Sequence, residues 1–401
     1  MYALSQKGLK FDFTTCVKPD IKKLENAYGS KIVSIIRKAE KINILESLED
    51  NVIDRIVEKG NYDITVNTHG DTLPFYHHSF SRSNALTYCH FPSAKYHIDS
   101  ENLEYLRDIR VATNFFSQIQ NIDFFSTRGE ALILDFETKR QVKDYFRFLS
   151  AKYDSLMKNT WVLTNSQYCR KVIYNALGID SKIVYPPVDV ETFRETALKS
   201  TIQREDIILV ISRIAPDKQI ENAIELAKIL RGRGIGRKKK GMVIAGNVHH
   251  YDEQYYQELK KMIADYDLSD YISLQTTISF SKLVKLMQLA KVYFHPRIDE
   301  HFGISSVEAM ASGLVPIVSD IGGHTEFVPS KYHFHTLGHA ADLVALAFEA
   351  TTTDSERKDI SDSTIRFSNE NYISSFNHIL SELLCEKVKN GMGVVNLNTL
   401  A

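Results

Sequence analysis

The chain has 401 residues, with 49 Lys+Arg against 50 Asp+Glu and a formal net charge of −1. At about 100–200 residues per domain, this length predicts two or three domains. The composition, 43% hydrophobic and 25% charged, excludes disorder, collagen or a coiled coil for the whole chain, and the balanced charge argues against a dedicated nucleic-acid binder.

Cysteine spacing and hydropathy bear on the cellular compartment. The four cysteines stand too far apart for a metal knuckle or a CxxC pair, and their sparsity fits a reducing compartment. No apolar run reaches the roughly 20 residues that span a bilayer, and the first residues do not resemble a signal peptide. We expect a cytoplasmic protein, with contact to the cytosolic face of a membrane left open.

The first half of the chain alternates strand and helix patterns. The predicted strands are Leu9–Thr15, Tyr62–Asn67, Asn84–Cys89, Trp161–Asn165 and Lys182–Tyr185. A helix is expected after Ser166, whose hydroxyl can cap it. Pro186 and Pro187 stop regular structure, so the first domain is predicted over residues 1–186.

The second half repeats this order more regularly. Residues Asp206–Ser212 form a continuous apolar run, typical of a strand buried on both faces of a parallel sheet. The elements predicted after it are helix Gln219–Leu230, strand Met242–Ala245, helix Tyr255–Tyr266, strand Tyr271–Gln275, helix Phe280–Leu289, strand Val292–His295, helix Ile304–Ala311 and strand Val315–Ser319. This order predicts an α/β fold with a doubly wound parallel sheet, whose ligands bind at the carboxyl ends of the strands.

The domain organisation follows from these patterns. We expect two Rossmann-like domains facing a cleft, the second over residues 187–365. A C-terminal helix is expected within 366–390, because apolar residues recur at helical spacing there, and residues 391–401 are expected to form a tail.

Residues 292–328 carry the most informative chemistry. A loop after a buried strand carries Glu300, and a helix that begins near Ile304 carries Glu308, eight positions later. Backbone N–H groups at the helix start, with the positive end of the helix dipole, can bind hydroxyls or an anion. The two carboxylates can then hold two parts of one extended ligand. The alternative is an exposed acidic loop before an ordinary helix.

This stretch resembles the E-x7-E signature of retaining glycosyltransferases of the fourth sequence family, which have the two-domain GT-B fold. The resemblance implies that Glu308 binds the ribose hydroxyls of a nucleotide sugar. It also implies that Glu300 and the backbone N–H groups of Phe302, Gly303 and Ile304 contact the transferred sugar.

Further glycines match the same family pattern. Gly322 and Gly323 follow the strand Val315–Ser319, and Gly246 follows the strand Met242–Ala245. The resemblance implies that all three help to bind the donor, since glycine lets a backbone approach a ligand closely.

A second motif, Ile211-Ser-Arg-Ile-Ala-Pro-Asp-Lys218, places two cations after a strand. In the family that this motif resembles, Arg213 and Lys218 hold the diphosphate of the donor. Fixed cations stabilise the negative charge that develops on a leaving phosphate. No DxD-type metal motif stands in a matching place, so neither a metal nor another cofactor is expected. The alternative is an exposed salt bridge at a helix start.

A third motif places His90 at the end of the strand Asn84–Cys89. Family members carry a histidine there that faces the transferred sugar, which implies a supporting catalytic role for His90. The alternative is an ordinary packing residue. No protein nucleophile is expected, because retaining members are thought to react on the front face of the donor.

Three details resemble the dolichol-linked mannosyltransferases that extend the N-glycan precursor: Tyr185-Pro-Pro, His90-Phe-Pro and the run from Arg297 to Ile304. They imply transfer of mannose from GDP-mannose to a lipid-linked oligosaccharide or another glycan. Two alternatives stay open: a transferase of the same family that uses a UDP-sugar, and a non-catalytic protein that binds sugar nucleotides. The sequence does not determine the base, the sugar, the linkage or the acceptor.

Two further expectations concern the first domain. Family members begin with a strand and a Gly-Gly loop, whereas this chain opens with what resembles the end of the next helix, so the first strand is expected to be missing. Phe115-Phe116, Phe124-Phe125, Arg128 and Tyr145–Phe148 combine aromatic and basic residues, which is typical of a membrane interface. The alternative for these residues is domain core.

Overall fold

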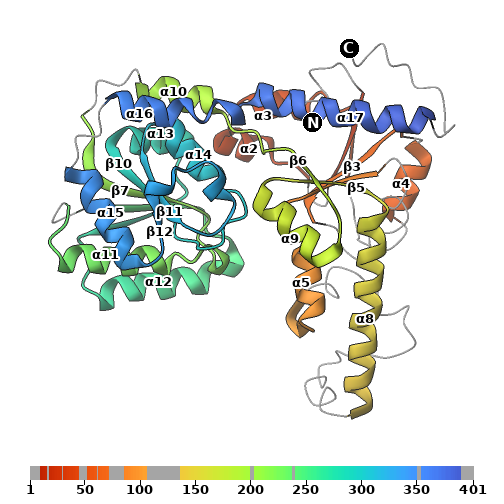
Figure 1. Ribbon diagram of the computed structural model, residues 1–401, viewed down its shortest axis with the longest axis horizontal. Helices are drawn as coiled ribbons and strands as arrows, with labels where there is room; N and C mark the ends of the chain where they lie inside the picture. The colour runs from red at the N-terminus through yellow and green to blue at the C-terminus, as the bar shows by residue number, and fades with distance from the viewer. Residues whose placement is uncertain are drawn as a thin grey trace. The chain divides into compact units, whose positions relative to one another are not determined.

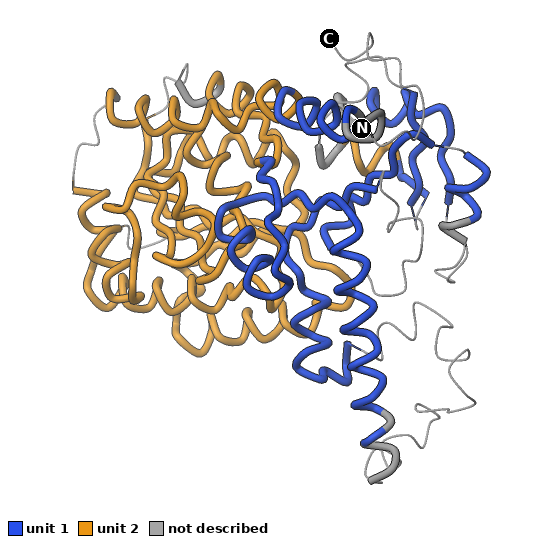
Figure 2. Tube along the Cα trace, turned by 45° about the vertical axis from the view of Figure 1, so that its right-hand side comes forward, with its two compact units in different colours: residues 1–20, 33–184, 374–401 blue, residues 21–32, 185–373 orange. Residues whose placement is uncertain are grey.

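The computed structural model describes residues 10–15, 18–28, 30–44, 52–60, 62–71, 85–105, 136–198, 203–236, 240–349 and 354–389. The chain divides into two compact units (Figure 2). Unit 1 consists of residues 1–20, 33–184 and 374–401, and unit 2 consists of residues 21–32 and 185–373. The main division, between residues 184 and 185, lies two residues before the boundary expected after residue 186.

Unit 2 is built on one six-stranded parallel sheet. Its spatial order is β12 (His333–Phe334), β11 (Val315–Ser319), β10 (Ala290–Phe294), β7 (Glu205–Ile211), β8 (Met242–Gly246) and β9 (Ile272–Thr276). The chain winds outward from β7 to β9, then returns to the other side of β7 with β10. The predicted doubly wound sheet is confirmed, and its topological switch point, where such sheets bind ligands, lies between β7 and β10.

Helices cover both faces of this sheet (Figure 1). One face packs against α11 (Glu221–Gly232), α12 (Glu253–Asp265) and α15 (Leu337–Glu349). The other packs against α10 (Val190–Leu198), α13 (Phe280–Leu289), α14 (Ile304–Ala311) and α16 (Asp354–Asp362). Unit 2 also contains α2 (Ile21–Tyr28) and the 3-10 turns η2 (Pro216–Lys218), η3 (His250–Asp252), η4 (Gly323–Glu326), η5 (Ser330–Tyr332) and η6 (Ile365–Phe367).

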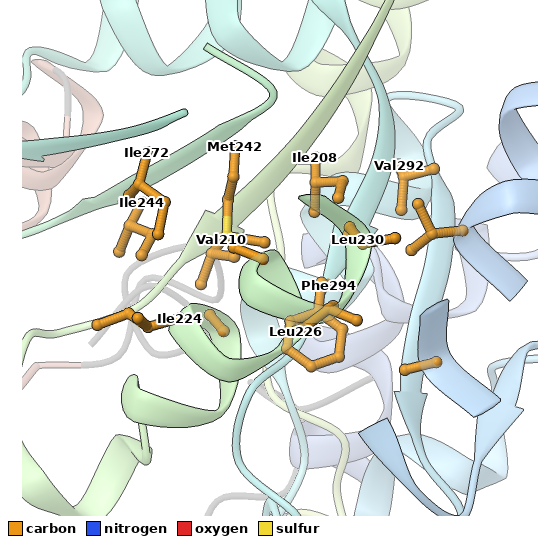
Figure 3. Close-up of a cluster of buried hydrophobic side chains, with 14 of the residues drawn as sticks. Ile208, Val210, Ile224, Leu226, Leu230, Met242, Ile244, Ile272, Val292 and Phe294 are labelled. Atoms are coloured by element: carbon orange, nitrogen blue, oxygen red, sulfur yellow. The ribbon is translucent and has the colours of Figure 1, made fainter. Parts of the chain in front are cut away.

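The apolar run in β7 has a direct structural reason. Successive strand residues point to opposite faces, so Ile208 and Val210 enter the core beneath α11, which Figure 3 shows. Ile207 and Leu209 enter the core on the α14 side. Since both faces are covered, every residue of the strand centre must be apolar, and full burial of each such side chain contributes about 1.5–3 kcal/mol.

Over the residues that the structure describes, unit 1 contains two parallel sheets. The strands β3 (Thr65–Gly70), β4 (Ala85–Cys89), β5 (Trp161–Thr164) and β6 (Lys182–Ile183) lie side by side in this order. The strands β1 (Asp12–Thr15) and β2 (Lys41–Ile44) pair separately. Over the described ranges, no strand joins the two sheets, but the Tyr62 hydroxyl donates to Asp12 Oδ2. The missing first strand stays a prediction.

In the described residues, unit 1 contains the helices α4 (Val52–Gly60), α5 (Ser93–Asp99), α8 (Phe136–Lys158) and α9 (Gln167–Leu177), while α3 (Ser30–Ile36) and α17 (Asn369–Lys389) belong partly to each unit. The predicted cap is confirmed, because Ser166 Oγ accepts from the Cys169 N–H at 3.0 Å. Residues from 374 onward in α17 belong to unit 1, where Glu382 pairs with Lys182.

Several predicted details in unit 1 are wrong. The strand expected at Tyr62–Asn67 is β3, which begins three residues later, and the strand expected at Lys182–Tyr185 ends at Ile183. The 23-residue helix α8 was not predicted; it buries Tyr145 and Phe146 in the unit 1 core and exposes Phe148. Phe115-Phe116, Phe124-Phe125 and Arg128 lie outside the described residues. Among the helices described, none is long and apolar enough to span a membrane.

Candidate active site

Two loops meet at the switch point of the unit 2 sheet. The loop after β7 carries Arg213 and leads into η2, which ends at Lys218. The loop after β10 carries Arg297 and Glu300. Since β7 and β10 are hydrogen-bonded parallel neighbours, their carboxyl ends lie together, and so do the charged residues that follow them.

The central contact joins Lys218 to Glu300. Lys218 Nζ lies 2.9 Å from Glu300 Oε2, and the His301 backbone N–H donates to Glu300 Oε1 at 3.0 Å. Burial opposes ionisation of Glu300, which is 7% exposed, but the charges of His295, Lys218 and Arg297 hold its pKa well below the usual range. Burial lowers the pKa of His295 to about 4, so at neutral pH Lys218 and Arg297 supply the positive charge.

Arg213 lies farther out than Lys218. Its Nη2 is 3.1 Å from Asp217 Oδ2, and its side chain is 49% exposed, against 19% for Lys218. Asp217 Oδ2 is also 4.0 Å from Lys218 Nζ. The two predicted cations are therefore linked through Asp217, and Lys218 alone contacts Glu300.

Gly322 and Gly323 shape the Glu300 loop. Gly322 forms an isolated bridge with Glu300, and the Gly323 N–H donates to the Glu300 carbonyl at 2.7 Å. Gly322 has φ +119°, and a Cβ there would lie 2.5 Å from the Glu300 carbonyl oxygen; a Cβ on Gly323 would lie 2.0 Å from that of His301. Only glycine permits this approach, so both residues position Glu300, while their contact with a donor stays a prediction.

Gly246 has a comparable packing role at the end of β8. A Cβ there would lie 1.7 Å from the Ser212 carbonyl oxygen, at the end of β7. The absent side chain lets the two strand ends approach each other beside the Arg213 loop. Donor binding by Gly246 stays a prediction.

The helix α14 begins where the sequence predicted. Gly303 is its N-cap residue with φ +96°, and Ile304, 47% exposed, is its first residue, with no acceptor for its N–H inside the helix. Phe302 is 3% exposed and packs among the rings of Tyr185, Phe327 and Phe367. The Phe302 side chain is therefore core, and only its backbone is left to contact a ligand.

Glu308, on α14, differs from Glu300 in its surroundings. Burial, and then the negative charge of Asp189, raise the pKa of Glu308 to about 7. The Tyr293 hydroxyl, 2.7 Å from Ser305 Oγ, interacts electrostatically with both glutamates. The two predicted glutamates thus share Tyr293 as a neighbour, but one is held ionised and the other close to half-protonated at neutral pH.

His90 belongs to unit 1, at the carboxyl end of β4. Its side chain is accessible, and its backbone N–H donates to the Gly70 carbonyl at 2.6 Å. A Cβ on Gly70, which has φ +96°, would lie 3.0 Å from His90 Nδ1. Partial desolvation, and then the nearby His69, lower the pKa of His90, so its imidazole is neutral at pH 7.

Sequence reasoning missed five charged or titratable residues of this site. They are Asp217, His295, Arg297, Asp299 and His301, and each lies within five positions of a predicted residue. Their nearness to those residues was visible, but loops have no periodicity from which side-chain direction can be read.

In the part of the chain that the structure describes, no group of three or more His, Cys, Asp and Glu could hold a metal ion.

Comparison with known proteins places this geometry in context. Residues 193–363 match the family described as Glycosyl transferases group 1. A GDP-Man:Man(3)GlcNAc(2)-PP-Dol alpha-1,2-mannosyltransferase of Dictyostelium discoideum is 24% identical over 77% of this chain and 61% of its own length. The human Alpha-1,3/1,6-mannosyltransferase ALG2 is 28% identical over 42% of this chain and 44% of its own. The chain thus spans less than two thirds of these relatives.

Solved structures show the fold. A glycosyltransferase from Rickettsia africae ESF-5 has a TM-score of 0.64 at 15% identity, covering 95% of this chain and 92% of its own. Alr3699/HepE of Anabaena, solved in complex with UDP and glucose, has a TM-score of 0.60 at 14% identity, covering 93% and 99%. The predicted GT-B fold class is confirmed.

Proposed function

We propose that this chain, whose residues 193–363 match the glycosyl transferases group 1 family, is a retaining mannosyltransferase that uses GDP-mannose. The observation that carries the proposal is the partly buried Lys218–Glu300 pair at the switch point of the unit 2 sheet. It puts a cation for a diphosphate next to an ionised carboxylate for sugar hydroxyls. The names of the mannosyltransferase relatives support the choice of sugar and donor.

In the proposed reaction, Arg213 and Lys218 bind the diphosphate of the donor. Lys218 can donate up to three hydrogen bonds, and in this structure one of them goes to Glu300. As the glycosyl–phosphate bond breaks, these preorganised charges stabilise the leaving phosphate, and each such group is worth about 3 kcal/mol in comparable sites. We propose that they do so without a metal ion, so that activity should persist in EDTA.

Glu300 and Glu308 hold the two sugars of the donor in this proposal. Ionised Glu300 accepts hydrogen bonds from hydroxyls of the transferred sugar, while Glu308 binds the ribose hydroxyls. The backbone N–H groups of residues 302–304 assist at the start of α14. The neutral imidazole of His90 is proposed to contact the transferred sugar.

The proposal is tested by binding and transfer together. At a concentration of 100 Kd, GDP should stabilise the folded protein by about 2.7 kcal/mol, which raises the melting temperature. UDP at the same concentration should raise the melting temperature less. Lys218→Ala and Glu300→Ala should each lower transfer from GDP-mannose at least a hundredfold. Lys291→Ala is the matched control, because Lys291 pairs with Asp206 near the amino ends of β10 and β7, opposite the site.

Each outcome separates the candidate functions. Preference for UDP, which the solved HepE complex makes the second candidate, would indicate a UDP-sugar donor. Nucleotide binding without transfer or donor hydrolysis would indicate a non-catalytic sugar-nucleotide binder. Unchanged turnover in both alanine variants would make the site assignment wrong.

We also propose a lipid-linked acceptor at the cytosolic face of a membrane. The name of the Dictyostelium discoideum relative gives a PP-Dol-linked sugar as its substrate. On α8, Phe148 is 48% exposed beside Arg147, and Lys152 Nζ lies 5.7 Å from its ring. Aromatic and basic residues of this kind seat helices on anionic interfaces. Vesicles containing anionic lipid should float the wild type but less of Phe148→Ser, and equal flotation would contradict the membrane contact.

A further inference from the structure

Arg297 is a third cation of the site, and it is the most buried of the three. Its side chain is 13% exposed, and Arg297 Nε donates to Asp299 Oδ1 at 3.0 Å. Its Nη2 lies 3.0 Å from His301 Nε2, and its Nη1 lies 3.8 Å from Asp217 Oδ2. Burial alone would lower the pKa of Arg297, but the negative charges of Glu300, Asp299 and Asp217 raise it.

The charges of this cluster balance one another. Its cations are Arg213, Lys218 and Arg297, and its carboxylates are Asp217, Asp299 and Glu300. The two histidines of the cluster do not alter this balance at neutral pH, because burial lowers the pKa of both His295 and His301 to about 4. A diphosphate that enters the site must therefore compete with carboxylates for its cations.

That competition would be costly without a further positive charge. If Lys218 turned toward a phosphate, Glu300 would keep a buried negative charge without its nearest partner. An uncompensated buried charge is strongly unfavourable. If Arg213 turned likewise, Asp217 would lose its 3.1 Å partner. A cation that stays in place, 3.8 Å from Asp217 Oδ2 and in electrostatic interaction with Glu300, reduces both costs.

Arg297 is held so that it stays in place. Its two close partners, Asp299 and His301, belong to its own loop. The loop is tied to the β7 side, because Gln219 Oε1 accepts from the Ile298 N–H at 3.0 Å. A second tie, from Asn222 Nδ2 to the Pro296 carbonyl, also spans 3.0 Å.

We propose that Arg297 is a positioning residue: the standing counter-ion of Asp217 and Glu300, which frees Arg213 and Lys218 to bind the donor's diphosphate. This inference rests on the proposed function, since it presupposes a diphosphate ligand. It assigns to Arg297 no contact with the reacting atoms.

The test measures binding of GDP and of UDP by titration calorimetry on the full chain. Arg297→Gln should weaken binding of the preferred nucleotide roughly tenfold or more, because Asp217 and Glu300 then hold the other cations. The nucleotide affinity of Arg297→Lys should lie between those of the wild type and Arg297→Gln. Adding Asp217→Asn to Arg297→Gln should restore most of the affinity, since it removes the carboxylate that captures Arg213.

Rescue by loss of an acid separates this role from a structural one, because a variant that is merely misshapen gains nothing from a second substitution. Arg233→Gln is the matched control: it removes a guanidinium paired with Asp342 outside the site and should bind as the wild type. If Arg297→Gln does not fold, the test rests on the Asp217→Asn variant. It should bind the preferred nucleotide severalfold more tightly than the wild type.

Two results have distinct meanings. A wild-type chain that binds neither nucleotide would overturn the proposed function. If the wild-type chain binds a nucleotide, any one of three results would overturn the role of Arg297 alone. These are an Arg297→Gln variant with wild-type affinity, a double variant without restored affinity, and an Asp217→Asn variant with weaker binding.

Discussion

At the scale of single residues, burial alone does not decide whether a carboxylate is ionised. Glu300 has Lys218 at 2.9 Å and is held ionised, whereas Glu308 has the negative Asp189 as its electrostatic neighbour and a pKa raised to about 7. The difference is one of partners, because opposite charges favour the charged form and like charges disfavour it.

Glu308 should make stability depend on pH. Its pKa is raised from 4.5 to about 7 in the fold, so its contribution is fully present below pH 4.5 and is lost as pH rises through 7. Between pH 5 and 8, the wild type should lose about 2 kcal/mol of unfolding free energy relative to Glu308→Gln. Urea unfolding of both proteins at the two pH values measures this, and parallel pH dependences would contradict it.

The glycine at 322 should resist even the smallest side chain. Gly322→Ala puts a methyl group 2.5 Å from the Glu300 carbonyl oxygen at φ +119°, so it should cost about 3 kcal/mol or more and weaken nucleotide binding. Gly234→Ala is the control in the same unit: its φ is +69° with no atom within 4 Å, and it should cost only about 1–2 kcal/mol. Equal losses of unfolding free energy would refute the close-approach argument.

At the scale of elements, two helices, α9 and α13, begin at a capping serine, and the two serines differ in burial. Ser166 is fully buried, accepting from the Cys169 N–H at 3.0 Å and donating to Asn165 Oδ1 at 3.0 Å. Ser279 caps α13 in the same way, at 3.3 Å, but is exposed. Removing the serine hydroxyl therefore leaves a buried N–H without an acceptor in α9, but a solvent-accessible one in α13.

The two caps should differ in a measurable way. Ser166→Ala leaves a buried N–H without its acceptor and should cost about 2 kcal/mol of unfolding free energy, whereas water can replace the cap in Ser279→Ala, which should cost about 0.5–1 kcal/mol. Chemical denaturation, followed by circular dichroism, compares them. A larger loss at Ser279 would show that burial does not control the worth of the cap.

At the scale of the whole molecule, each unit has its own hydrophobic core. The clusters on the two faces of the β7–β12 sheet contain only residues of unit 2, and the cluster around Tyr153 and Leu149 contains only residues of unit 1. Separate cores of this kind are the condition for separate unfolding transitions.

Calorimetry should therefore resolve two transitions. Leu209→Ala removes a fully buried side chain from unit 2, costing about 2–5 kcal/mol, and should lower one transition temperature, while Ser166→Ala lowers the other. GDP should raise only the transition that responds to Leu209→Ala, because Lys218 and Glu300 lie in unit 2. A single transition that both substitutions lower would contradict separate cores.

Local pattern in the sequence was sufficient for elements whose ends are marked by strong signals. The predicted bounds of α13, α14 and β11 equal the observed ones, since a capping serine, two glycines and an apolar strand delimit them. Helix α8 was missed although its buried residues Tyr145, Leu149, Tyr153 and Met157 recur at helical spacing. Strand β3 was placed three residues too early because the alternation of apolar and polar residues already begins at Tyr62.

The sequence by itself determined the α/β class and indicated that Arg213, Lys218, Glu300 and Glu308 follow strand ends, because periodicity, glycines and charge types are local properties. Only the tertiary structure decided which charges meet. Lys218 and Glu300 are 82 positions apart and come together because the crossover from β9 returns to the free side of β7. Arg297 acquired its role in the same way, since the partners of a loop side chain depend on which strands are neighbours, and no local pattern encodes that.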